Sequence, residues 1–185
     1  MSDFQQHNDA VQTEAAQEML PLQFLVGSWF LHDSYQYCTQ TAKKAARLEA
    51  QGVEWVHYAT GLAVGNLRTI ERIVTFSLEN QSPVYVSGIH ASTRDVLIQM
   101  SEYGYALHAV CHSHPGNGIN ATHPSTIDIS HQKRLERGGY HVISCIYSRD
   151  GFARFFTVDS EFAIEIYGKG VEEVDRNVFH LAKGH

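Results

Sequence analysis

The chain has 185 residues, 43% of them hydrophobic, which is typical of one globular domain with an ordinary core. Its formal net charge of −6 argues against binding to nucleic acid or to an anionic membrane, because both attract basic faces. The 3 cysteines are too few for a disulfide framework, and we expect them to be reduced and mostly buried. With no secretory signal and no apolar run near the roughly 20 residues that cross a bilayer, the sequence predicts a cytoplasmic protein.

The N-terminal half is expected to begin with a polar tail over residues 1–18, followed by a single domain over residues 19–185. Residues 20–33 are rich in large apolar side chains and must pack against the core, although their pattern does not decide between helix and strand. Residues 34–50 predict an amphipathic helix. Strands are then expected over residues 53–64 and 69–76, with a third strand within residues 81–88.

The C-terminal half is expected to begin with a helix that Ser92 caps and that ends near Tyr103. A strand over residues 105–111 and a loop over 115–124 then lead to a helix over 125–137. The remaining strands are predicted over residues 140–147, 152–158, 162–166 and 177–181, with an Asp-Gly turn joining the first two. Because helices and strands interleave, the sequence predicts an α/β fold in which a mixed β-sheet is sandwiched by helices.

The most informative motif is His112-Ser-His-Pro followed by Ser125-Thr-Ile-Asp. Alternate residues of a strand project to the same face, so His112 and His114 at a strand end can point at one ion. Ser125 is expected at the start of the next helix, with Asp128 in its first turn. Two imidazoles and one carboxylate leave the fourth position of a tetrahedral zinc open, which is the pattern of a catalytic site.

This motif resembles that of the JAMM/MPN+ metalloproteases, zinc-dependent isopeptidases that remove ubiquitin-like modifiers. The resemblance runs from about residue 34 onward and implies the JAMM/MPN (cytidine-deaminase-like) fold. It implies that Zn²⁺ is bound by His112, His114 and Asp128, and that Ser125 stabilises the tetrahedral intermediate. The 115–124 loop is longer than is usual in the family, and such a surface insertion costs little.

The general base stands outside this motif. Family members usually carry a Glu just before a Gly-x-x-x-Gly strand, and in the matching position before Gly61 this chain has Tyr58. Glu54 shares a strand face with residue 58, so we predict that Glu54 is the base. Glu71 on the next strand is the alternative, and a domain with no functional base is the third.

Other histidines lie near the motif in the sequence. His123 in the loop is a candidate for a contact around the metal. His131 is a second candidate, because its spacing from Asp128 places it on the same helix face. His108 is expected on a strand face.

The resemblance also implies a substrate. Isopeptidases of this class bind the extended C-terminal tail of a ubiquitin-like protein. Residues 140–156 are similar to JAMM proteins of bacterial operons that encode such a modifier with its conjugation enzymes and are associated with antiphage defence. The expected partners are therefore that tail and the enzymes of the operon. The alternatives are a JAMM peptidase for a sulfur-carrier protein or small peptides, a non-catalytic MPN scaffold, and a DNA-associated protein of the RadC type, which the acidic charge disfavours.

Overall fold

The structure is a computed structural model that describes residues 21–49, 53–82 and 85–182. The elements in chain order are β1 (Leu22–Gly27), α1 (Ser28–Glu49), β2 (Val56–Thr60), β3 (Ala63–Val64), β4 (Leu67–Ile70), β5 (Arg72–Val74), β6 (Leu78–Ser82), β7 (Tyr85–Gly88), α2 (His90–Glu102), β8 (Ala109–Ser113), the 3₁₀ turn η1 (Ile119–Thr122), α3 (Thr126–Arg137), β9 (Ile143–Tyr147), β10 (Phe152–Phe156), β11 (Phe162–Tyr167), β12 (Val171–Asp175) and β13 (Val178–Leu181). Among these helices, none is both long and apolar enough to span a membrane.

The central layer is a seven-stranded sheet with the order β12-β13-β10-β9-β8-β2-β5. Within it β8 and β9 are parallel, and the other neighbours are antiparallel. A parallel pair needs a crossover connection, which η1 and α3 supply here. A smaller sheet has the order β11-β1-β4-β3, and β6 and β7 form a separate hairpin.

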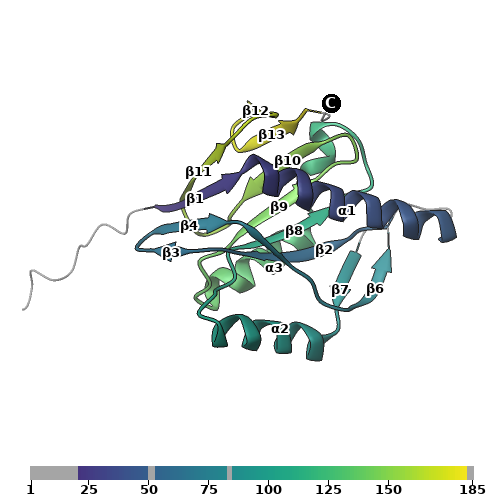
Figure 1. The fold of residues 1–185 in the computed structure, drawn as a ribbon. Helices are drawn as coiled ribbons and strands as arrows, with labels where there is room; N and C mark the ends of the chain where they lie inside the picture. Colours follow the sequence, from purple (N-terminus) through teal and green to yellow (C-terminus); the bar gives the residue numbers. More distant parts are fainter. Residues whose placement is uncertain (1–20, 50–52, 83–84, 183–185) are drawn as a thin grey trace, which may run out of the picture.

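Helices cover both faces of the central sheet, with α1 in front and α3 behind it in Figure 1. On the α1 side, Phe30 and Leu31 pack with the small buried residues Ala59, Cys111 and Cys145 of the sheet. All three cysteines are free and buried, as expected.

The opposite face is packed by α2 and α3. Tyr58 of β2 and Val110 of β8 form a second core cluster with Met100 of α2, and Leu135 of α3 packs against it. Tyr58 and Ala59, like Val110 and Cys111, are neighbours in sequence but belong to opposite faces, as the alternation of strand side chains requires. The predicted α/β fold, a mixed sheet between helices, is confirmed.

The start of the domain differs from the prediction. The apolar run over residues 20–33 divides into strand β1 and the beginning of α1, so this helix starts at Ser28 rather than at Ser34. β1 is parallel to both of its neighbours and half of it is fully buried, and such strands are continuous apolar runs without the alternation that identifies a strand. The predicted tail over residues 1–18 and the helix end near residue 50 lie outside the described residues.

Two of the predicted long strands are each split between two sheets. The 53–64 strand becomes β2 and β3, and the 69–76 strand becomes β4 and β5. The chain leaves the central sheet at Gly61, where any Cβ would collide with the Thr69 carbonyl group, and it returns at Glu71. Glycine is required by this close approach, which the periodicity of the sequence does not reveal.

Residues 81–88 contain the predicted third strand, β7, together with the end of β6, which pairs with it in antiparallel fashion. Two further features differ from the prediction. The N-cap of α2 is Ile89, and the Ser92 hydroxyl instead accepts the Ser77 N–H at 3.0 Å. β12 was not predicted. In contrast, α3 and the β9–β10 hairpin lie where the sequence places them.

Candidate metal centre and cleft

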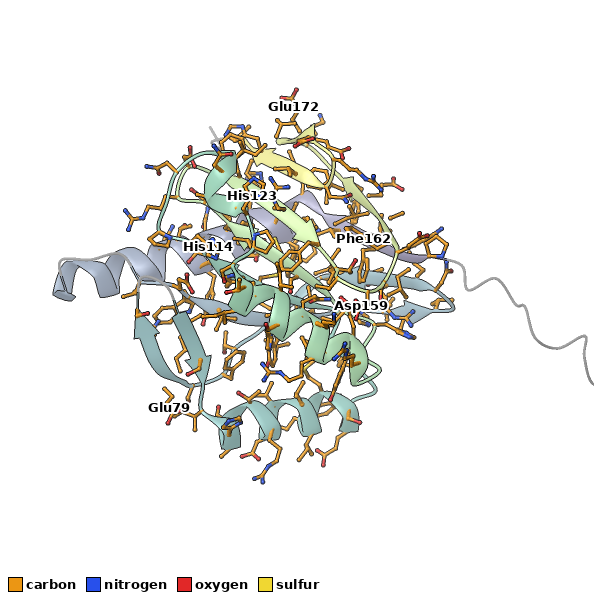
Figure 2. The ribbon with its side chains drawn as sticks, turned by 180° about the vertical axis from the view of Figure 1, so that it is seen from behind. Glu79, His114, His123, Asp159, Phe162 and Glu172 are labelled. Atoms are coloured by element: carbon orange, nitrogen blue, oxygen red, sulfur yellow. The ribbon has the colours of Figure 1, made fainter. Side chains whose placement is uncertain are left out.

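The two histidines of the motif are held by the middle of the central sheet. His112 is on β8, which is hydrogen-bonded on both sides and aligns this residue with Val56 of β2 and Ile146 of β9. His114 follows the end of β8, and its N–H donates to the Tyr147 carbonyl group at 2.8 Å, which extends the parallel pairing. In Figure 2 His114 lies near the start of α3, on the face of the sheet opposite α1.

Asp128, in the first turn of α3, completes a group of three side chains whose ligand atoms all lie within 4.8 Å of one another. The two Nε2 atoms are 3.2 Å apart, and the Asp128 carboxylate lies 3.2 Å from that of His112 and 3.4 Å from that of His114. Donors bound to a tetrahedral zinc at about 2.0–2.1 Å are separated by roughly 3.3 Å. The donor atoms therefore have the types and spacing that a zinc ion requires, and this group could bind a metal ion.

Hydrogen bonds orient two of these ligands. The Nδ1–H of His114 donates to the Ala121 carbonyl group at 2.8 Å, because a carbonyl can only accept, so in the neutral imidazole Nε2 is the unprotonated atom that faces the cluster. The Asp128 carboxylate accepts the backbone N–H of Ser125 at 2.7 Å. Both side chains are thus directed toward the cluster without an ion.

Ser125 is the N-cap of α3. Its hydroxyl group accepts the Asp128 N–H at 3.3 Å, and together with the return bond from Ser125 N–H to Asp128 this forms a capping box. A hydroxyl group that accepts one bond keeps its own hydrogen free to donate. The position and the chemistry of Ser125 therefore allow it to donate to an oxygen atom near the cluster.

Glu54 lies two residues before the start of β2, and its Oε1 is 3.9 Å from Nε2 of His114. The β6 strand fixes the backbone of this residue, because the Glu54 N–H donates to the Ser82 carbonyl group and the Gln81 amide donates to the Glu54 carbonyl group. Burial raises the pKa of the Glu54 carboxyl to about 7; the nearby His114 opposes this rise and Asp128 adds to it. The contribution of Gln81 was missed, since nothing in the sequence connects the hairpin to residue 54.

The pKa values of two ligands also shift in the metal-free site. Burial works against ionisation of both, but it is outweighed by their mutual contacts. Hydrogen bonds from His112 and His114 hold the pKa of Asp128 well below its usual range. The hydrogen bond with Asp128 and the charge of Glu54 raise the pKa of His114. This is the charge pairing expected of a compact cluster of bases and acids.

Glu71, the alternative base, lies elsewhere. Its N–H donates to the carbonyl group of Thr60, at the other end of β2 from Glu54, and six residues of strand span about 20 Å. The guanidinium of Arg68 bonds to backbone carbonyl groups, and that of Arg72 lies over the Tyr105 ring. The structure therefore brings Glu54, and not Glu71, to the cluster.

A cleft of about 390 Å³ opens beside the cluster, between the central sheet, α2, α3 and the β6–β7 hairpin. Glu54, Val56 and Tyr58 all line it, so the predicted shared strand face is confirmed. The complete lining is Glu54, Val56, Tyr58, Phe76, Glu79, Val86, Ser87, Gly88, His90, Thr93, Val110, His112, Ile127, Asp128, His131, Arg134 and Ser144.

The other candidate histidines differ in their position relative to the cleft. His131 lines the cleft, and its pKa is lowered by burial and, to a smaller extent, by the nearby Arg134. His123 is exposed at the end of η1 and is not among the cleft residues, and Figure 2 shows it beside this turn. His108 is buried with its Nδ1–H donating to the Thr69 carbonyl group at 2.7 Å. The sequence did not single out Arg134 or the hairpin residues of the cleft, because they meet it only through tertiary packing.

No protein-family model matches the chain, and no curated protein matches it. Among solved structures, the solution structure of protein DSY2949 from Desulfitobacterium hafniense is similar, with 17% identity, a TM-score of 0.52, and coverage of 78% of this chain and 94% of that chain. A JAB1/MPN domain protein, AF2198 from Archaeoglobus fulgidus, also matches, with 14% identity, a TM-score of 0.42, and coverage of 77% and 98%. At these identities the likeness concerns the fold alone.

Proposed function

We propose that this protein is a zinc-dependent peptidase of the JAMM type that cleaves an isopeptide or peptide bond after the C-terminal tail of a ubiquitin-like protein. The observation that carries the proposal is the tetrahedral spacing of His112, His114 and Asp128 with the buried carboxylate of Glu54 beside them. An open fourth position and a nearby acid–base group are what distinguish a hydrolytic zinc site from a structural one.

The chain supplies the acid, the base and the oxyanion donor. When bound, zinc supplies a water of lowered pKa and polarises the scissile carbonyl group. The Glu54 carboxylate accepts the proton of the attacking water and delivers it to the leaving amine, for which its pKa near 7 suits it. The Ser125 hydroxyl donates to the oxygen of the tetrahedral intermediate.

The shape of the cleft supports an extended peptide as substrate. One wall is formed by Val86, Ser87 and Gly88 of β7, a strand that pairs only with β6 among the described residues and so keeps one free edge. A free edge can bind an extended chain by adding it as a further strand. As the resemblance to the isopeptidases implies, the proposed substrate has a small residue, glycine, at the scissile bond.

The test uses the full chain loaded with Zn²⁺ and a tagged ubiquitin-like fusion that ends in glycine before the tag. Wild-type protein is expected to release the tag, and a chelator is expected to stop the release. Glu54→Gln should lower kcat by about 10²–10⁴, because it removes the acid–base group and preserves volume. Ser125→Ala should lower kcat by about 10²–10³.

The thermal stability of each variant is measured alongside, because Ser125→Ala also removes a helix cap worth about 1 kcal/mol. Cleavage that persists in the chelator would contradict the proposal. Tight binding of the fusion without any cleavage would favour the non-catalytic scaffold, and cleavage of short peptides alone would favour the small-peptide alternative.

A further inference from the structure

The 115–124 loop, the feature in which the chain departs from the spacing of its motif, is fastened to the β9–β10 hairpin. Both carboxylate oxygens of Asp150, at the tip of this hairpin, accept the N–H of Gly118, at 2.8 and 2.9 Å. The neighbouring Arg149 N–H donates to the Gly116 carbonyl group at 2.9 Å. Gly118 has a φ of 76°, a left-handed conformation that glycine adopts without strain, and it begins η1.

A second attachment lies inside the protein. Thr122, at the end of η1, is fully buried, and its hydroxyl group accepts the Nε–H of Arg154 from β10 at 3.1 Å. The same hydroxyl group donates to the Ile119 carbonyl group at 2.7 Å, so it closes the turn and ties it to the hairpin at once. A buried hydroxyl that makes both bonds is costly to replace, because Arg154 would lose its partner.

Between these two attachments lies Ala121, whose carbonyl group accepts the Nδ1–H of His114. Ala121 also lies against Gly116, where an added Cβ would stand only 2.8 Å from the Ala121 Cβ, so these two loop residues approach closely. The segment that carries the carbonyl group bonded to His114 is therefore held on either side, by Gly118 with Asp150 and by Thr122 with Arg154.

We infer that Asp150, Thr122 and Arg154 are positioning residues for the metal ligand His114, and that the 115–124 loop is a support of the metal centre rather than a tolerated insertion. The inference rests on the metal site of the proposed function. Groups that hold the second nitrogen of a histidine ligand fix its tautomer and direction, and removing such groups typically weakens metal binding by about 10–100-fold. Here that group is the backbone carbonyl of Ala121, which no substitution removes. Metal binding should therefore weaken when the side chains that hold this backbone segment are removed.

The test is a metal-affinity measurement by competition with a chromophoric chelator, which requires no substrate. Thr122→Val keeps the shape of the side chain and removes the hydroxyl group, and it should weaken Zn²⁺ binding by about 10-fold or more. Thr122→Ser restores the hydroxyl group and should recover most of the affinity. Thr60→Val is the matched control, because the Thr60 hydroxyl is also buried and donates to a backbone carbonyl, that of Ala106, away from the cluster.

Asp150→Ala is the second variant, because Asp150 is exposed and its loss leaves the core intact. It should weaken Zn²⁺ binding by several-fold, whereas Asp175→Ala, which removes another exposed carboxylate bonded to a backbone N–H, should leave the affinity unchanged. Thermal unfolding of the metal-free variants separates the two effects: Thr122→Val and Thr60→Val should lose similar stability, but only the former should lose affinity.

The tautomer of His114 gives a readout that needs neither metal nor activity. By nitrogen NMR of the metal-free protein at alkaline pH, wild-type His114 should carry its proton on Nδ1, and Thr122→Val should show both tautomers. Unchanged affinity and tautomer in Thr122→Val, or an equal loss in Thr60→Val, would overturn the inference. Tight metal binding by a protein that cleaves no substrate would contradict the proposed function and leave the inference standing.

Discussion

The two faces of the central sheet are built from alternate residues of the same strands, yet they differ in almost every property. Along β8, Cys111 and Ser113 face α1, and Ser113 donates to the carbonyl group of Cys38 in that helix. Val110 and His112, one position away in each case, line the cleft. The α1 face is closed and packed, whereas the other face is opened by the cleft and carries the ionisable cluster.

One face of the sheet mainly stabilises the fold, whereas the other face holds the candidate metal site. The α1 face holds the larger of the two apolar core clusters, which stabilises the fold by removing its side chains from water. The cleft face keeps buried carboxylates and imidazoles close together, an arrangement that costs stability unless the groups are paired or bind an ion. Substitutions on the two faces should therefore separate stability from activity.

The largest effect on the free energy of unfolding is expected from a substitution on the α1 face. Leu31 is fully buried in the α1 core cluster, so Leu31→Ala should lower the free energy of unfolding by about 2–5 kcal/mol through lost burial and the cavity that remains. Denaturant unfolding measures this loss. The folded fraction of the variant should bind Zn²⁺ with the wild-type affinity. A loss of affinity as large as that of a ligand variant would show that the two faces are not independent.

A smaller effect on stability is expected from the protonation of His57. This residue is on β2 between the cleft residues Val56 and Tyr58 but faces α1. Its Nδ1–H donates to the Tyr58 carbonyl group, and its Nε2 accepts the hydroxyl of Ser34, which in turn accepts that of Tyr147. Burial lowers the pKa of His57 to about 4, although the bond to Tyr58 opposes this.

Because the unfolded chain binds the proton with an ordinary pKa near 6.5, the stability from neutral His57 is complete above that pH and is lost as the pH falls toward 4. The loss should reach about 3 kcal/mol. His57→Gln should flatten this part of the pH profile, measured by urea unfolding of the metal-free protein. Equal slopes in wild type and variant would show that another group is responsible.

The smallest effect is expected from Glu71→Gln, the matched control for Glu54→Gln. Glu71 lies at the far end of β2, so the substitution should change kcat by less than about twofold and stability by no more than about 0.5 kcal/mol. Steady-state kinetics on the fusion substrate measure the first quantity. If Glu71→Gln lost as much activity as Glu54→Gln, the assignment of the base to Glu54 would be wrong.

The sequence was most informative where one element alone decides the outcome. The spacing of His112 and His114, the helix start at Ser125, and the common face of Glu54 and Tyr58 all follow from the period of a strand or from local capping chemistry. In each case the expected arrangement is found, while the roles of these residues stay predictions.

Sequence reasoning failed where long-range packing decides. The strand character of β1 depends on its two parallel neighbours, and the change of sheet at Gly61 depends on the Thr69 carbonyl group. His114 bonds to the backbone carbonyl group of Ala121, and the residue type at position 121 gives no sign of such a bond. Arg134 and the β7 residues reach the cleft only because three elements converge there.

The capping box at Ser125 and Asp128 bears on how such motifs should be weighed in other chains. The same carboxylate that faces the two imidazoles also starts α3, and a cap of this kind contributes about 1 kcal/mol to a helix even in a chain that never binds an ion. Selection for folding alone would therefore retain the Ser-x-x-Asp half of the motif in a descendant that had lost its chemistry. His112 and His114 cap no helix, so the histidine pair is the diagnostic half.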